Sequence, residues 1–152
     1  MFTPHQLLVL RAAIQRIVPP DGSAVSAPDD EFPGGWEAGA GDYLLRQLAP
    51  EGDLHALAGL YAAGLDALDA EARALSPGGK GFADLDAPAQ DALLARVEAG
   101  NVLTGAWPPD LEPALFFRRF AEHVAEGFYS DPGNGGNKNG VSWKMIGFEV
   151  RG

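Results

Sequence analysis

The three histidines are the chain's main candidates for acid–base chemistry or metal binding. His5, His55 and His123 are far apart in the sequence, and none lies in a His-Glu-x-x-His pattern. The chain has no cysteine, which excludes disulfides, thiolate catalysis and Cys-ligated zinc or iron–sulfur clusters. It also lacks a Gly-x-Ser-x-Gly elbow, a dinucleotide fingerprint and a Cys-x-x-Cys-His haem site. We therefore predict no catalytic, cofactor-binding or metal-binding residue.

A run of adjacent carboxylates, Asp29-Asp30-Glu31, raises the possibility of a metal or paired-carboxylate site. It lies within residues 19–38, which are rich in Pro, Gly, Ser and acidic residues and show no periodicity. With no histidine nearby, such a run is typical of a solvated loop. We expect Phe32 and Trp36 to attach this loop to the rest of the protein.

A run of Gly and Asn at residues 133–140 invites two ligand-binding interpretations. A phosphate loop needs a preceding strand and a following helix, but this run follows a predicted helix. A calcium loop of the EF-hand type needs Asp at its first position and Glu at its twelfth, where this chain has Gly135 and Ile146. Neither interpretation fits the residues.

Three other interpretations of this run stay open. The Asn side chains can bond to the backbone in a purely structural loop. A rigid loop ending near Trp143 and Lys144 also suits recognition of a partner protein. The third possibility is that the loop forms a pocket wall in a stand-alone enzyme or small-ligand-binding protein.

The segment around this run carries a family resemblance. The order Gly-Phe-Tyr-Ser-Asp-Pro, then Gly-Gly-Asn, then Trp-Lys-Met-Ile-Gly-Phe resembles the C-terminal signature of the gluconate 2-dehydrogenase subunit 3 family. Asn134 stands where members often have an aromatic residue. The signature residues, with a partner-binding or structural role, are Tyr129, Asp131, Pro132, Gly135, Gly136, Asn137, Trp143, Lys144, Gly147 and Phe148.

The resemblance implies a non-catalytic small subunit of an oxidoreductase complex. In such a complex it binds and stabilises an FAD-dependent dehydrogenase of the glucose-methanol-choline type, acting on a sugar or sugar acid. A c-type cytochrome often accepts the electrons. FAD is then expected in the partner subunit, and no cofactor is expected in this chain. In exported relatives, the small subunit also escorts the catalytic subunit across the membrane.

Length and charge set further bounds. The chain of 152 residues fits one domain, spanning residues 1–152. Its formal net charge of −10 argues against binding to nucleic acid or to an anionic membrane surface. No window reaches the roughly 20 apolar residues of a membrane span, so we expect no direct membrane insertion.

The N-terminal residues bear on localisation. No positively charged segment leads into an apolar run, and the pair Arg118-Arg119 lies inside a predicted helix, where it cannot act as a twin-arginine export signal. As the chain stands we expect a cytoplasmic protein. A periplasmic location is expected if a signal was removed or if the partner carries one.

The hydrophobic pattern predicts an all-α fold of about five helices, in a single compact domain with long ordered loops and a C-terminal Gly/Asn-rich loop. The first helix starts at Thr3, whose capping box includes Gln6, and the second spans residues 39–48. Asp53 and Asp86 are the predicted N-caps of the third and fourth helices. No convincing strand is present, although residues 141–148 can form a short extended piece.

The predicted fifth helix covers about residues 111–128. Four of its apolar residues form a stripe at helical spacing, and we predict that this stripe belongs to the core: Phe117, Phe120, Val124 and Phe128.

Overall fold

Helices make up all the regular secondary structure that the structure describes, which confirms the all-α prediction. The computed structural model describes residues 2–20, 34–103, 105–129 and 136. The α-helices are α1 (Pro4–Ile17), α2 (Ala40–Leu48), α3 (Ala58–Leu75), α4 (Ala87–Glu98) and α5 (Pro113–Tyr129), with short 3-10 turns η1 (His55–Leu57) and η2 (Phe82–Asp84). None of the helices in these ranges is long and apolar enough to cross a membrane.

Polar caps fix the starts of two helices as the sequence predicts. The Thr3 hydroxyl accepts a hydrogen bond from the Gln6 N–H at 3.0 Å, and Gln6 Oε1 accepts one from the Thr3 N–H at 2.9 Å. At α4, Asp86 Oδ1 accepts from the Ala89 N–H at 2.9 Å. The first N–H groups of a helix have no backbone acceptor within that helix, and each of these caps supplies a side-chain acceptor for one of them.

The predicted start of the third helix is wrong. Asp53 is not an N-cap, because α3 begins at Ala58 after the turn η1. The Leu54 N–H donates to the Gln47 carbonyl at 2.8 Å, and the Asp53 N–H donates to Gln47 Oε1 at 3.3 Å. These bonds hold residues 53 and 54 against the end of α2. The helix α3 therefore starts only after these two residues.

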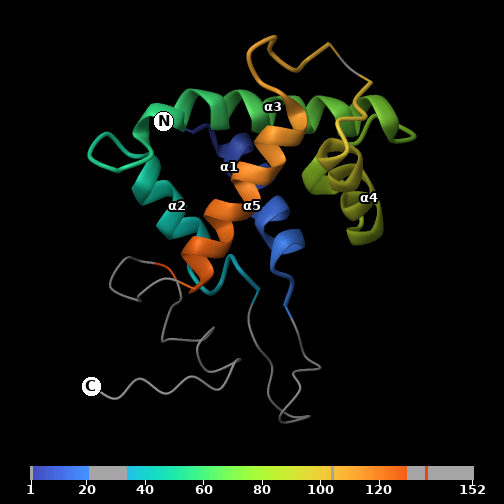
Figure 1. The fold of residues 1–152 in the computed structure, drawn as a ribbon. Coiled ribbons are helices and arrows are strands. Elements are labelled where there is room, and N and C mark those ends of the chain that lie inside the picture. Colours follow the sequence, from blue (N-terminus) through green and yellow to red (C-terminus); the bar gives the residue numbers. More distant parts are fainter. Residues whose placement is uncertain (1, 21–33, 104, 130–135, 137–152) are drawn as a thin grey trace, which may run out of the picture.

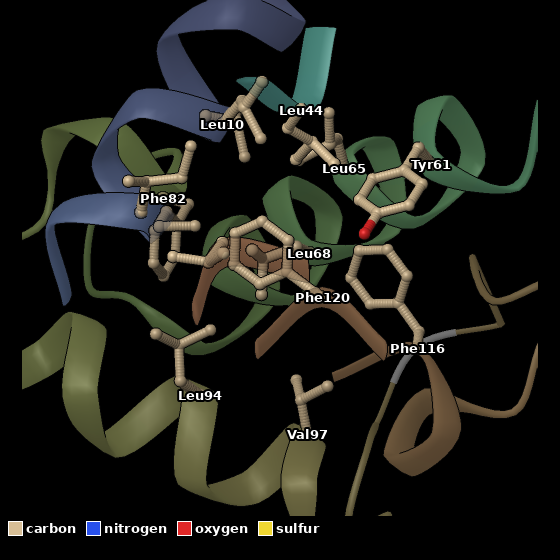
Figure 2. Packing of buried hydrophobic residues seen from close by; sticks show 14 of the residues in the cluster. Leu10, Leu44, Tyr61, Leu65, Leu68, Phe82, Leu94, Val97, Phe116 and Phe120 are labelled. Atoms are coloured by element: carbon tan, nitrogen blue, oxygen red, sulfur yellow. The ribbon is translucent and has the colours of Figure 1, made fainter. Parts of the chain in front are cut away.

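The helix α5 occupies the middle of the bundle (Figure 1). It lies between α2 on one side and α4 on the other, while α3 runs across the top of the view. In Figure 2, Phe120 of α5 lies among Leu68 of α3 and Leu94 and Val97 of α4. The core is therefore built around one face of α5.

The predicted stripe on this helix needs one correction. Phe120, Val124 and Phe128 are buried, but Phe116 takes the fourth core position and Phe117 is only partly buried. The reason is the i, i+4 row through 116, 120 and 124, which places Phe116 over the turn that faces α3. Its ring stacks on Phe120 with centroids 6.1 Å apart.

A glycine allows α3 and α5 to approach each other closely. A Cβ atom at Gly64 would lie 2.2 Å from Cε2 of Phe116. Any larger residue at this position would collide with the ring, so the spacing of the two helices depends on Gly64.

Asp69 connects three elements in what we call the Asp69 junction: Asp69, His5, Arg73 and Phe82. Its Oδ2 lies 2.9 Å from His5 Nε2 and accepts from Arg73 Nε at 3.0 Å. Its Oδ1 accepts from the buried Phe82 N–H at 3.0 Å. Burial acts to raise the pKa of Asp69, but these hydrogen bonds outweigh it, and the pKa lies below its usual value. The i, i+4 ion pair of Asp69 and Arg73 is thus part of a larger network.

One loop contact is also as expected. Trp36 packs against the core cluster, and its backbone N–H donates to Gln15 Oε1 at 3.1 Å. The Arg11 guanidinium lies over its ring, 5.8 Å from the centroid. The other expected anchor, Phe32, and the carboxylate run at residues 29–31 lie outside the described residues.

Candidate partner-binding surface

The signature residues are described at only two positions. Tyr129 is the last residue of α5 and is 52% exposed, whereas Gly136 is buried. The remaining signature residues lie outside the described part of the chain, as does the possible extended piece at residues 141–148: Asp131, Pro132, Gly135, Asn137, Trp143, Lys144, Gly147 and Phe148. Their role stays a prediction.

The C-terminal end of α5, where the signature begins, is fixed by packing. Phe128 is buried and meets the Tyr129 ring edge-on, with centroids 5.0 Å apart. A Cβ atom at Gly127 would lie 2.7 Å from the Tyr43 ring and 3.2 Å from Cα of Ala40. The last turn of α5 is therefore held tightly on α2, and the Tyr129 side chain is directed toward solvent.

Tyr43 adds a polar contact to this end of α5. Its hydroxyl lies near the Glu126 carboxylate. Burial, together with the negative charge of Glu126, raises the pKa of Tyr43. The phenol thus stays protonated at neutral pH and can donate to the carboxylate.

A buried pair, Tyr61 and His123, connects α3 to α5. The Tyr61 hydroxyl lies 2.5 Å from His123 Nδ1. Burial raises the pKa of Tyr61, with Glu126 and Glu122 adding to the effect. Burial also lowers the pKa of His123, against the opposing influence of the same two carboxylates. The tyrosine is therefore the donor and the neutral imidazole the acceptor, an arrangement that stabilises the helix contact and activates neither group for catalysis.

Next to this pair, a groove of about 200 Å³ runs between the start of α3 and the start of α5. We call it the α3–α5 groove. Its apolar lining includes Leu60 and Leu115, which are 36% and 40% exposed. Asp110, Glu112 and Arg119 bring both signs of charge to its lining.

A second groove, of about 300 Å³, lies between the end of α3 and α4. We call it the α3–α4 groove, and its lining residues are Ala72, Leu75, Ser76, Pro77, Leu85, Ala89, Ala92, Leu93 and Arg96. Arg96 is the single charged residue among them. Leu75 is 38% exposed here.

Arg96 is distinguished by an unsatisfied atom. Its Nε is buried and has no hydrogen-bond partner, a condition that among the described residues it shares with Trp107 Nε1. Trp107 packs against the core cluster, with its ring 5.8 Å from that of Phe116. Arg96, by contrast, lines a groove that a ligand can enter.

The described residues show no constellation for metal chemistry. No group of three or more His, Asp or Glu side chains within those ranges is placed to hold a metal ion. Of the two grooves described above, the α3–α4 groove has a single charged residue in its lining, and the α3–α5 groove has three.

The family can be assigned from the whole length of the sequence. The model of the family described as gluconate 2-dehydrogenase subunit 3 matches residues 4–150. The chain belongs to this family. The match extends from the first residue of α1 through all five described helices and across the signature segment. Searches of curated proteins and of solved structures find no match to the chain.

Membership in the gluconate 2-dehydrogenase subunit 3 family confirms the resemblance carried by the C-terminal signature. The sequence did not point to the two grooves. Leu75, Leu85 and Leu93 look like ordinary core positions in the sequence, and only the arrangement of α4 beside the end of α3 places them around an opening. The small residues Ala89 and Ala92 on α4 were the one available signal.

Proposed function

We propose that this protein is a non-catalytic subunit that binds and stabilises an FAD-dependent dehydrogenase of the glucose-methanol-choline type. The observation that carries the proposal is the family match over residues 4–150, since the family is named as a subunit of gluconate 2-dehydrogenase. FAD, the substrate site and the electron-transfer chemistry then belong to the catalytic partner. The partner oxidises a sugar or a sugar acid.

The described surface supports a binding role. Exposed leucines gather at two grooves, with Leu60 and Leu115 at one and Leu75 at the other. Apolar recesses with few polar groups are typical of the central part of protein interfaces. An accessory subunit needs such a surface and needs no reactive side chain.

The test is co-purification from the native host with a tag on this chain. The expected result is a yellow complex that contains a second chain and the absorbance band of oxidised flavin. Dehydrogenase activity with gluconate or glucose should accompany the flavin through gel filtration. A parallel purification from cells without the tag is the control.

A colourless, monodisperse single chain would contradict the proposal. It would favour the alternative of a stand-alone binding protein or enzyme. If a second chain co-purifies without flavin, the protein has a partner, but that partner is not a flavoprotein.

A further inference from the structure

We propose that the α3–α4 groove is where the catalytic flavoprotein docks, through an apolar side chain next to an Asp or Glu carboxylate. This inference rests on the proposed function and adds to it the surface and the chemistry of recognition. The three observations behind it are the shape of the groove, the single sign of its charge and the unsatisfied Arg96 Nε.

The size and lining of the groove suit a side chain of a protein. Pockets for small molecules and cofactors range from about 300 to 1,000 Å³, so the groove, at about 300 Å³, is at the lower end. Leu75, Leu85 and Leu93 line it together with Pro77. A leucine or phenylalanine side chain from a partner can be removed from water there, which is the dominant favourable contribution in protein association.

The charge of the groove indicates which polar group the docking segment carries beside its apolar side chain. Arg96 is the one charged residue of the lining, and it takes part in none of the ion pairs found among the described residues. A guanidinium binds a carboxylate through two parallel N–H bonds, a geometry that Lys cannot reproduce. A carboxylate on the incoming segment therefore complements the groove.

The unsatisfied Nε strengthens this argument. Because the atom is already shielded from water, its N–H has lost its solvent partner without gaining one from the described part of the chain. A rotation of the guanidinium toward the groove would let Nε and one terminal nitrogen share an incoming carboxylate. The buried N–H would then gain a hydrogen-bond acceptor only in the complex.

The α3–α5 groove is the weaker candidate. It has exposed leucines as well, but Asp110 and Glu112 line it together with Arg119. Its lining therefore favours neither a positively nor a negatively charged group on the partner. It is also smaller, at about 200 Å³ against about 300 Å³.

The first test measures the affinity of subunit variants for the flavoprotein, purified free of the wild-type subunit. Arg96→Gln is expected to weaken binding by about tenfold or more. The affinity of Arg96→Lys is expected to lie between that of Arg96→Gln and that of the wild type. Leu75→Asp, which places a charge of the wrong sign in the groove, is expected to weaken binding further. Arg46→Gln and Leu8→Asp are the matched controls, since both change exposed residues on other helices.

The second test identifies the occupant directly. Because the chain has no cysteine, Ala92→Cys provides a single thiol in the groove for a photo-crosslinker. The crosslink is expected to join the flavoprotein at a peptide with an apolar residue beside Asp or Glu. Leu8→Cys, on an exposed part of α1, is expected to give no such product.

The outcomes separate the two proposals. If the tagged wild type brings down no flavin, the proposed function fails and the docking site fails with it. If the wild type binds the flavoprotein and the groove variants bind equally well while remaining folded, only the docking site is overturned. A crosslinked peptide without a carboxylate side chain overturns the assignment of the occupant.

Discussion

Asp69 and Arg96 both bring a charged group into the interior, but only Asp69 finds partners there. Both oxygens of Asp69 accept hydrogen bonds from groups on three elements, α1, α3 and η2. The Nε of Arg96 is also buried and has no acceptor among the described residues. The comparison indicates that the Asp69 junction serves the fold, whereas the Nε–H group of Arg96 is not used within the described chain, as the proposed docking site requires.

The largest effect is expected from loss of the Asp69 carboxylate. In Asp69→Ala the buried Phe82 N–H and the Nε–H group of Arg73 lose their acceptor, which should lower the free energy of unfolding by about 2–4 kcal/mol. Urea denaturation followed by circular dichroism measures the change. Asp91→Asn is the control, since Asp91 is paired with Arg16 at the surface and should contribute about 0–1 kcal/mol. If the two variants lose equal stability, the Asp69 junction is no more than a surface contact.

The pH dependence of stability sharpens the same point. The pKa of Asp69 is lowered in the folded protein, so its carboxylate stabilises the fold above the unfolded value of 3.8. That contribution is lost as the pH falls through the folded pKa. The stability difference between wild type and Asp69→Asn should therefore shrink at pH values below 3.8. Urea titrations at pH values on either side provide the measurement, and a constant difference would contradict the prediction.

The smallest effect on stability is expected at Arg96. Since its Nε makes no hydrogen bond within the described chain, Arg96→Gln should change the free energy of unfolding by less than about 1 kcal/mol, mostly through packing of the side-chain stem. Thermal unfolding of the isolated subunit checks this. A loss as large as that of Asp69→Ala would show that Arg96 is a structural residue and would remove the contrast between the two sites.

Much of the fold could be predicted from local sequence signals. The capping residues Thr3 and Asp86 mark helix starts correctly, because a cap is formed by residues within one turn of each other. Asp53 misled the prediction because a contact with Gln47 of the preceding helix overrides its capping preference. The shift from Phe117 to Phe116 likewise depends on where α3 lies, which periodicity alone does not determine.

The candidate site was less accessible to sequence reasoning. Asp69 looked like half of an ordinary i, i+4 pair, because its other partners, His5 and Phe82, come from distant parts of the chain. The groove beside Arg96 lies between the end of α3 and α4, which come from separate parts of the chain, and it leaves no local pattern. The C-terminal signature identified the family, but the roles of Trp143 and its other undescribed residues stay predictions.

The close contact of α2 with α5 also has a consequence for synthesis on the ribosome. Leu44 and Leu48 of α2 are completely buried, yet α2 packs against α5, which is made only after α3 and α4. Contacts between segments so distant in the chain form late, because a long loop must close first. The emerging chain must therefore carry an apolar helix face without its cover until α5 is released. During this interval the nascent protein is most exposed to aggregation and to capture by chaperones.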